Sequence, residues 1–134
     1  MNVQPGMTAE IEWVVKPELT ADVLGNPGVK VFATPFVVCL IENAAIEVLR
    51  AHLPPGGASV GTKVDIKHLA ATPLGMKVRA KATLLETDGR RHVFQVEAFD
   101  EVEKIAEARH ERFTVPNLEK FLERAMKKGQ SSAS

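Results

Sequence analysis

Glu42 is a charged residue at an apolar position. It lies in residues 34–53, the most apolar stretch of the chain, and at helical spacing it shares a face with Val38, Ala45 and Leu49. A helix that is apolar on nearly every side belongs in the interior of a protein. A carboxylate on such a face is paired, protonated or functional, because burying it alone costs a large free energy.

Two further residues could work with Glu42. His68 lies on the apolar face of the strand predicted after this helix, and Thr34 begins the helix. If the strand packs on the helix, a carboxylate, an imidazole and a hydroxyl meet in a largely dry cavity. Glu42 could then act as nucleophile or general base, His68 could transfer a proton, and Thr34 could orient the reacting group. The buried N-terminus of the helix could also stabilise negative charge on a carbonyl oxygen.

Each of the three residues also has a structural explanation. Thr34 is well placed as an N-cap, which would occupy its hydroxyl with the backbone of the helix. A lone histidine such as His68 on an apolar strand face is often a hydrogen-bonded core residue. Glu42 could be the ion-pair partner of Arg79 or Arg112. Spacing alone does not decide between the structural and the catalytic roles.

Neither a thiol nucleophile nor a metal site is expected. Cys39 is the single cysteine, and cysteines in the middle of a helix usually behave as small buried hydrophobes. The remaining histidines, His52, His92 and His110, lack the spacing of metal ligands. The sequence therefore predicts no metal and no cofactor.

The elements that would position these residues follow from periodicity and turn chemistry. The helix over 34–53 has Pro35 at its first position, and prolines and glycines at 54–57 end it. A loop is expected at 18–31 and an amphipathic helix at 116–128. Alternating segments predict five strands, at 7–15, 58–72, 76–87, 90–100 and 103–115. The last of these has a helix-forming composition, but its alternation favours a strand.

This order predicts an α+β protein with the hot-dog fold, in which an antiparallel sheet wraps around one long central helix. In the strand over 58–72, the inward face would carry Val60, Thr62, Val64, Ile66, His68 and Ala70, and the outward face Gly61, Lys63, Asp65 and Lys67. We expect one domain over residues 1–128 and a disordered tail over 129–134. Open sheet edges favour pairing with a second copy, so a homodimer is expected.

The composition is that of an ordinary globular protein. Of 134 residues, 45% are hydrophobic and 25% charged, and 17 acidic residues balance 17 basic ones. The sequence has no cluster of lysine and arginine residues, so neither a nucleic acid nor an anionic membrane is expected as a partner. The first residues lack the pattern of a secretory signal, and the longest apolar run is broken at Glu42 and Asn43. A cytoplasmic protein is the expectation.

Several motifs resemble one enzyme family. The segments VFATPF, LIENA, GTKVDIKHLAATPLG and HERF are similar, in order and spacing, to those of the fluoroacetyl-CoA thioesterases of the hot-dog class, from about Val31 to Phe121. The resemblance implies catalytic roles for Thr34, Glu42 and His68. It also implies that Gly61 lies near the thioester and that Arg112 matches the arginine of the HER motif.

The same resemblance implies an acyl-CoA substrate. A homodimer would bind it, and a tetramer made of two such dimers is the alternative. The segment LGNPGVKVF has Gly25 and Gly28 where the fluoroacetate-specific enzyme has phenylalanines, and Pro35 replaces a glycine. We therefore expect hydrolysis of a short- or medium-chain acyl-CoA rather than of the fluorinated substrate. A covalent acyl-Glu42 intermediate and direct attack by water both fit. The alternatives are a non-catalytic acyl-CoA-binding or metabolite-binding module and a hot-dog hydratase.

Overall fold

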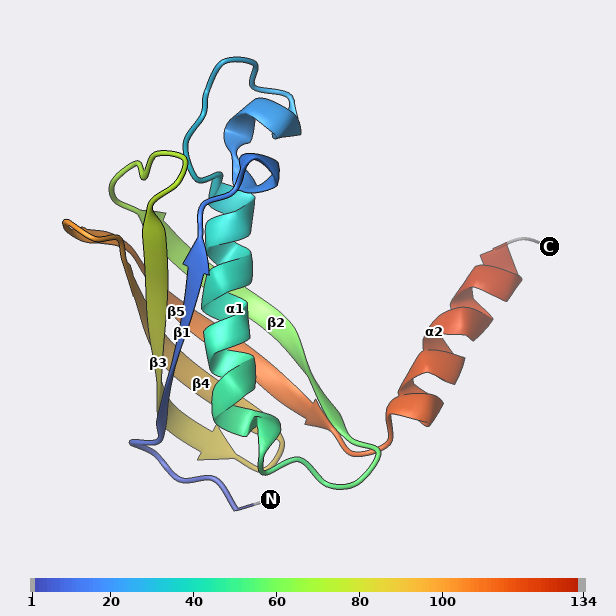
Figure 1. The fold of residues 1–134 in the computed structure, drawn as a ribbon. Helices are drawn as coiled ribbons and strands as arrows, with labels where there is room; N and C mark the ends of the chain where they lie inside the picture. The colour runs from blue at the N-terminus through green and yellow to red at the C-terminus, as the bar shows by residue number, and fades with distance from the viewer. Residues whose placement is uncertain (1, 133–134) are drawn as a thin grey trace.

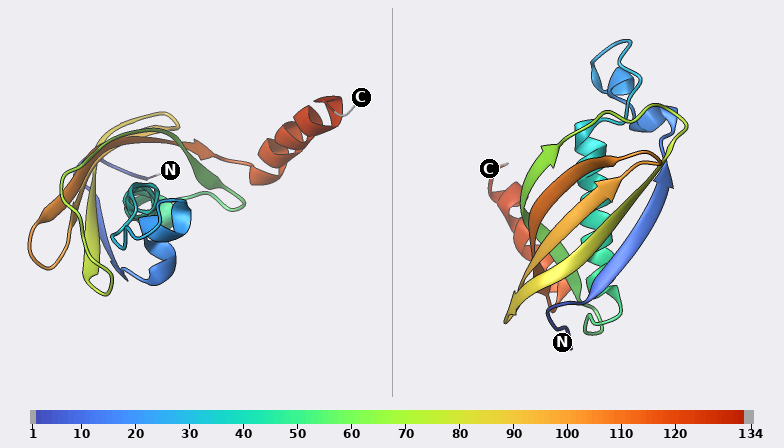
Figure 2. Two further views of the ribbon diagram at one scale, coloured as in Figure 1. Left: turned by 90° about the horizontal axis from the view of Figure 1, so that it is seen from above. Right: turned by 90° about the vertical axis from the view of Figure 1, so that its left-hand side faces the viewer.

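One helix and a curved sheet make up the body of the protein. In the computed structural model, which describes residues 2–132, helix α1 (Thr34–Arg50) lies in the concave face of a five-stranded antiparallel sheet (Figures 1 and 2). The strands are β1 (Thr8–Val14), β2 (Ala58–His68), β3 (Lys77–Asp88), β4 (Arg91–Phe99) and β5 (Lys104–Val115), and their order in the sheet is β1-β3-β4-β5-β2. The predicted fold class is confirmed, including the strand at 103–115.

The core forms between α1 and the inward side chains of the sheet. Burying the apolar surface of α1 is the main force that holds the helix in place. Seven residues of α1 are buried: Val37, Leu40, Ile41, Ala44, Ala45, Val48 and Leu49. Opposite them, β3 presents Val78, Ala80, Ala82 and Leu84, none more than 1% exposed. The alanines on β3 allow the helix to approach the sheet closely.

Strand β2 departs from the predicted alternation. Its pairing with β5 shifts between Gly61 and Lys63, so Thr62 is the extra residue of a β-bulge. The Thr62 hydroxyl bonds to Glu111 on the outward face. Gly61 therefore faces α1, and the predicted outward position of Gly61 and inward position of Thr62 are wrong. Val64, Ile66 and His68 keep the predicted inward side.

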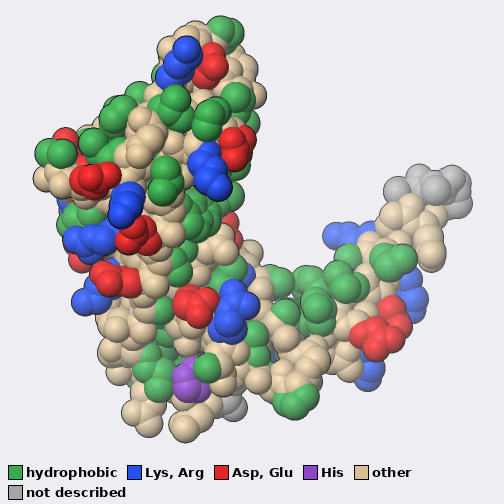
Figure 3. All heavy atoms as spheres, viewed as in Figure 1, with side chains coloured by type: hydrophobic (Ala, Val, Ile, Leu, Met, Phe, Trp, Pro, Cys, Tyr) green, Lys and Arg blue, Asp and Glu red, His purple; other side chains and the backbone are tan. Residues whose placement is uncertain are grey.

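Strands β1 and β2 form the two edges of the sheet. The outer side of each has no strand neighbour among the described residues. Helix α2 (Leu118–Ser132) extends past the β2 edge and stands away from the body (Figure 1). Hydrophobic side chains gather along one side of α2 and charged ones along the other (Figure 3). Residues 129–132, predicted to be disordered, continue this helix, and residues 133–134 lie outside the described residues.

The connection between β1 and α1 is more ordered than predicted. Two short 3₁₀ helices, Pro17–Leu19 and Ala21–Leu24, interrupt the predicted loop. Gly25 and Gly28 follow with φ angles of 92° and 87°, in the left-handed region that glycine adopts most easily. No helix among residues 2–132 is long and apolar enough to cross a membrane.

Candidate active site

Thr34 and His68 meet at the N-terminal end of α1. The Oγ1 atom of Thr34 lies 2.8 Å from Nδ1 of His68, at the end of β2. Ala33 occupies the N-cap position, and no side chain caps the helix. The predicted role of Thr34 as N-cap is therefore wrong: Thr34 is the first helical residue, so its hydroxyl is available to the imidazole.

The imidazole of His68 is half-buried, and its environment favours the neutral ring. Its Nε2 atom is buried and has no hydrogen-bond partner among the described residues. Burial lowers the pKa of His68, and a smaller opposing effect comes from the backbone of Ala70. The ring is thus neutral near pH 7, and its Nδ1 atom is hydrogen-bonded to the hydroxyl of Thr34. Residues 68–71 line an open cavity of about 260 Å³, in which a reacting group could approach the ring.

Glu42 belongs to a second group of residues, two helical turns further along α1. Its Oε2 atom lies 3.1 Å from Nη1 of Arg112, whose side chain is only 4% exposed against 34% for Glu42. Arg112 also donates to the hydroxyl and the carbonyl oxygen of Ser59. The predicted pairing with Arg112 is present. Arg79, the other candidate, pairs with Glu10 instead.

Gly61 leaves room for this ion pair. A Cβ atom at Gly61 would lie 2.7 Å from Oε2 of Glu42 and 3.2 Å from Nη1 of Arg112. Only glycine permits the carboxylate to come so close to the backbone of β2. Gly61 became an inward-facing residue through the bulge at Thr62, which alternation in the sequence does not reveal.

The three predicted catalytic residues are not all in contact within one chain. Thr34 and His68 form one pair, and among the described residues Glu42 makes no hydrogen bond or ion pair with either. Eight residues separate Thr34 from Glu42, which is about 12 Å along a helix axis. One chain therefore carries two half-sites at different heights along α1.

Comparison with known proteins decides the family. The model of the fluoroacetyl-CoA-specific thioesterase family (FlK) matches residues 15–118. The fluoroacetyl-CoA thioesterase of Streptantibioticus cattleyicolor is 42% identical over 92 residues, which are 69% of this chain and 66% of that protein, slightly less than two thirds of its length. A solved structure of fluoroacetyl-CoA thioesterase FlK superposes with a TM-score of 0.88 at 35% identity, covering 96% of this chain and 98% of that chain. The chain belongs to this family.

The resemblance to the fluoroacetyl-CoA-specific thioesterase family is thereby confirmed, and the chain is homologous to a thioester hydrolase. A hot-dog-like protein from Thermanaerovibrio acidaminovorans has a TM-score of 0.81 at 24% identity, over 92% of this chain and 90% of that chain. This last likeness concerns the fold alone and confirms the hot-dog architecture.

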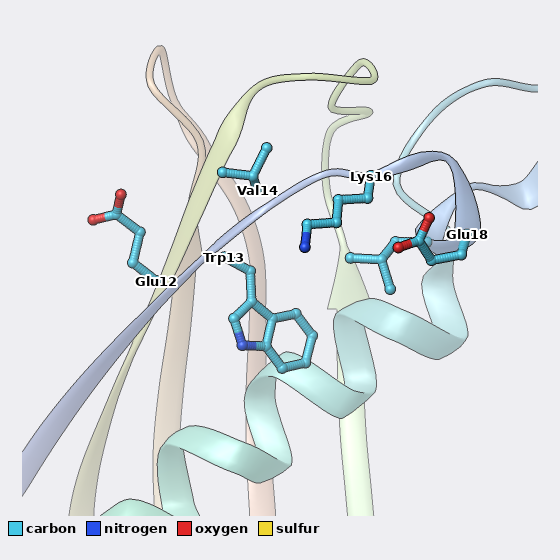
Figure 4. A pocket seen from close by; sticks show the side chains of 6 residues that line it. Glu12, Trp13, Val14, Lys16 and Glu18 are labelled. Carbon is cyan, nitrogen blue, oxygen red and sulfur yellow. The ribbon is translucent and has the colours of Figure 1, made fainter.

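One cavity lies away from both half-sites of this family member. It measures about 480 Å³ and lies beside β1, where the indole of Trp13 points toward α1 and Glu12 points away (Figure 4). None of the predicted site residues lines it. Cys39, expected to be buried, is exposed. The residues that the structure describes contain no group of three or more potential metal ligands from histidine, cysteine, aspartate and glutamate.

Histidine burial should make the stability of the protein depend on pH. The pKa values of His68, His92 and His110 are all lowered in the folded chain, mainly by burial. The ordinary pKa of histidine is 6.5. Below this pH the histidines take up protons in the unfolded chain but remain largely neutral in the folded chain. We expect the free energy of unfolding, measured by urea titration, to fall as pH decreases from 7 to 5.5.

A variant distinguishes the histidines from the carboxylates as the cause. Glu111 and Glu107 also have lowered pKa values, but their ordinary value of 4.5 places their effect at lower pH. The substitution His92→Gln should therefore reduce the slope between pH 7 and 5.5. An unchanged slope in this variant would show that His92 takes up protons equally in the folded and the unfolded chain.

Proposed function

We propose that this protein is an acyl-CoA thioesterase that hydrolyses a short- or medium-chain acyl-CoA to the free acid and CoA. The observation that carries the proposal is the hydrogen bond between Thr34 and a neutral His68 whose Nε2 atom has no partner in the described chain. A buried imidazole nitrogen without a partner, beside a cavity, suits proton transfer to or from a reacting group. Membership of the thioesterase family supports the choice of a thioester as substrate.

Each residue has a role in breaking the thioester bond. The carboxylate of Glu42 attacks the carbonyl carbon, or removes a proton from a water molecule that attacks it. The electron pair of the broken C–S bond leaves with the sulfur of CoA, and the thiolate takes up a proton that the attacking water releases and that His68 accepts and passes on. Where Glu42 attacks first, water then cleaves the acyl-Glu42 intermediate and restores the carboxylate. Thr34 positions the carbonyl or the attacking group, while Gly61 and Arg112 bind the substrate beside Glu42.

The two half-sites would join in a homodimer. Strand β2 is a free edge that carries Lys63, Asp65 and Lys67. Two β2 edges can pair antiparallel about Val64, which sets Lys63 opposite the second copy's Asp65, or about Ile66, which sets Asp65 opposite the second copy's Lys67. Such opposite charges favour the pairing.

Either register brings the two groups of residues together. Because Thr62 is an extra residue in the strand, Gly61 of one copy then lies opposite residue 66 or 70 of the other, two residues from the second copy's His68 and on the same face. Glu42 of one copy would thus face Thr34 and His68 of the other across the interface, and acyl-CoA would bind between the copies.

Helix α2 supports the same arrangement. Its start is tied to the loop that precedes β2, because the N–H group of Leu118 donates to the carbonyl oxygen of Gly56. Its apolar face is 36–65% exposed at Leu118, Phe121, Leu122 and Met126. A lone amphipathic helix of 15 residues is marginally stable in water. A second copy at the β2 edge would cover this face.

The absence of aromatic residues at Gly25 and Gly28 supports an acyl group larger than fluoroacetyl. The neighbouring Val23 and Leu24 are 53% and 48% exposed, so this segment does not close over a small ligand in the described chain. Glycine can neither fill nor gate a pocket as phenylalanine does.

A panel of acyl-CoAs with detection of free thiol tests the proposed reaction. We expect CoA release that is fastest with short- or medium-chain acyl groups larger than fluoroacetyl, about 10⁶-fold or more above the uncatalysed rate. Tight binding of acyl-CoA without thiol release would identify a binding module instead. Release of a hydrated acyl-CoA rather than free CoA would identify a hydratase.

The substitution Gly61→Ala should disturb Glu42 without unfolding the protein. The new Cβ displaces the flexible carboxylate of Glu42, so hydrolysis should fall about 10²-fold, the usual consequence of a small misplacement of a reacting group. The melting temperature should stay within a few degrees. Thr62→Ala, the outward neighbour, is the matched control and should keep the activity. A Gly61→Ala enzyme with the wild-type rate would show that this close approach is unimportant.

A further inference from the structure

His110 is a fully buried polar residue that the proposed mechanism leaves unused. It lies on the inward face of β5, is 0% exposed, and packs its ring against Phe94 at a centroid distance of 6.2 Å. Its Nδ1 atom lies 2.7 Å from the carbonyl oxygen of Lys63. A carbonyl oxygen can only accept, so Nδ1 must carry the proton and donate it.

This bond fixes the state of the other ring nitrogen. In the neutral ring, Nε2 then carries a lone pair, and it lies 3.2 Å from Nη1 of Arg112. A guanidinium can only donate, so the Arg112 N–H donates to Nε2. A protonated His110 would instead turn an N–H group toward Arg112 and place one cation against another.

Through Arg112 the histidine reaches Glu42. The same Nη1 atom that donates to His110 also donates to Oε2 of Glu42 at 3.1 Å. The remaining nitrogens of Arg112 donate to Ser59 at 3.0 Å and 2.9 Å, so the guanidinium is held from three sides. Without an acceptor at Nε2, the buried Nη1 would lose one of its two partners and could turn.

We infer that His110 is a positioning residue, which holds Glu42 in its reactive orientation through Arg112; this inference rests on the proposed thioesterase function. The state required is the neutral ring protonated at Nδ1. The charged groups that face the ring are Arg112 on β5, Glu42 on α1 and Glu111 on β5, with the Lys63 backbone on β2. Burial, the largest effect on the pKa of His110, favours the neutral ring together with Arg112, and the Lys63 carbonyl and the two carboxylates oppose them.

Three substitutions at His110 separate positioning from packing. Gln can place an amide oxygen where Nε2 was and accept from Arg112. Asn keeps the donor to Lys63 but cannot reach Arg112, and Phe keeps the ring without hydrogen bonds. We expect His110→Asn and His110→Phe to lower kcat about tenfold or more with KM within about threefold, and His110→Gln to stay within about threefold of wild type.

A double-mutant cycle with Arg112→Lys gives the decisive readout. If His110 acts through Arg112, His110→Phe should cost less than about threefold in kcat once Arg112 is lysine. Equal losses in both backgrounds, or a Gln variant as slow as the Phe variant, would overturn the inference. His92→Phe is a control for the loss of a buried histidine, since His92 bonds Thr87 and Thr114 rather than Arg112; its effect on kcat should be the same in both backgrounds.

A measurement without substrate keeps this inference distinct from the proposed function. Nitrogen NMR of the imidazole should show His110 protonated at Nδ1 and unprotonated at Nε2 between pH 6 and 8. A ring protonated at Nε2, or doubly protonated at pH 7, would overturn the inference even in an active enzyme. Failure of the wild type to release thiol from any acyl-CoA would instead overturn the proposed function.

Discussion

Replacing Glu42 by glutamine should abolish thioester hydrolysis and leave the protein folded. Glutamine has the same shape and still offers Arg112 an acceptor oxygen, but its amide can neither attack a carbonyl nor take a proton. We expect CoA release to fall about 10³-fold or more. Because Arg112 is only 4% exposed and loses its counter-charge, the free energy of unfolding should also fall by about 1 kcal/mol.

Glu47→Gln is the matched control for this variant. Glu47 lies on the same helix, is exposed, and pairs with Arg50 at 2.9 Å. Such a surface pair contributes little, so this variant should keep both activity and stability. If Glu42→Gln hydrolysed acyl-CoA at the wild-type rate, Glu42 would be only the structural partner of Arg112, whatever the reaction of the enzyme.

The fold was predictable because hydrophobic periodicity and turn residues agree along most of the chain. Strand β5 shows why periodicity outweighs composition: Ala106, Ala108 and His110 face the core, although the segment is rich in helix-forming residues. The helix starting at Thr34 was also correct. It ends at Arg50 rather than at residue 53, before the prolines, since the last turn has little left to bury.

The site was less predictable than the fold. The face of an element on which a residue lies and its position along that element are independent, and spacing predicts only the face. Spacing correctly assigned Glu42 and His68 to inward faces, but it does not say how far along the sheet each residue lies. The bulge at Thr62 places Gly61 on the inward face instead of the outward one, and the residues around Thr62 do not predict a bulge. The role inferred for His110 depends on a backbone carbonyl at Lys63 and on Arg112 at once. The HERF motif contained both residues, but only their hydrogen bonds relate them to Glu42.

Two inactive variants should restore activity when they are mixed. If each site takes Glu42 from one copy and Thr34 with His68 from the other, a heterodimer of Glu42→Gln and His68→Ala contains one site with both residues intact. Random exchange of subunits makes half of the dimers mixed, so about a quarter of the wild-type sites should return. The measurement is thiol release after the two proteins are unfolded together and refolded, compared with each refolded alone.

The control for this experiment is the double variant Glu42→Gln/His68→Ala, because mixing it with either single variant regenerates no complete site. Mass spectrometry of the refolded mixture shows whether mixed dimers have formed. Mixed dimers without recovered activity would mean that Glu42 acts with His68 of its own chain. In that case α1 would have to bring the two groups together across about 12 Å of helix, and pairing at the β2 edge would have no part in the chemistry.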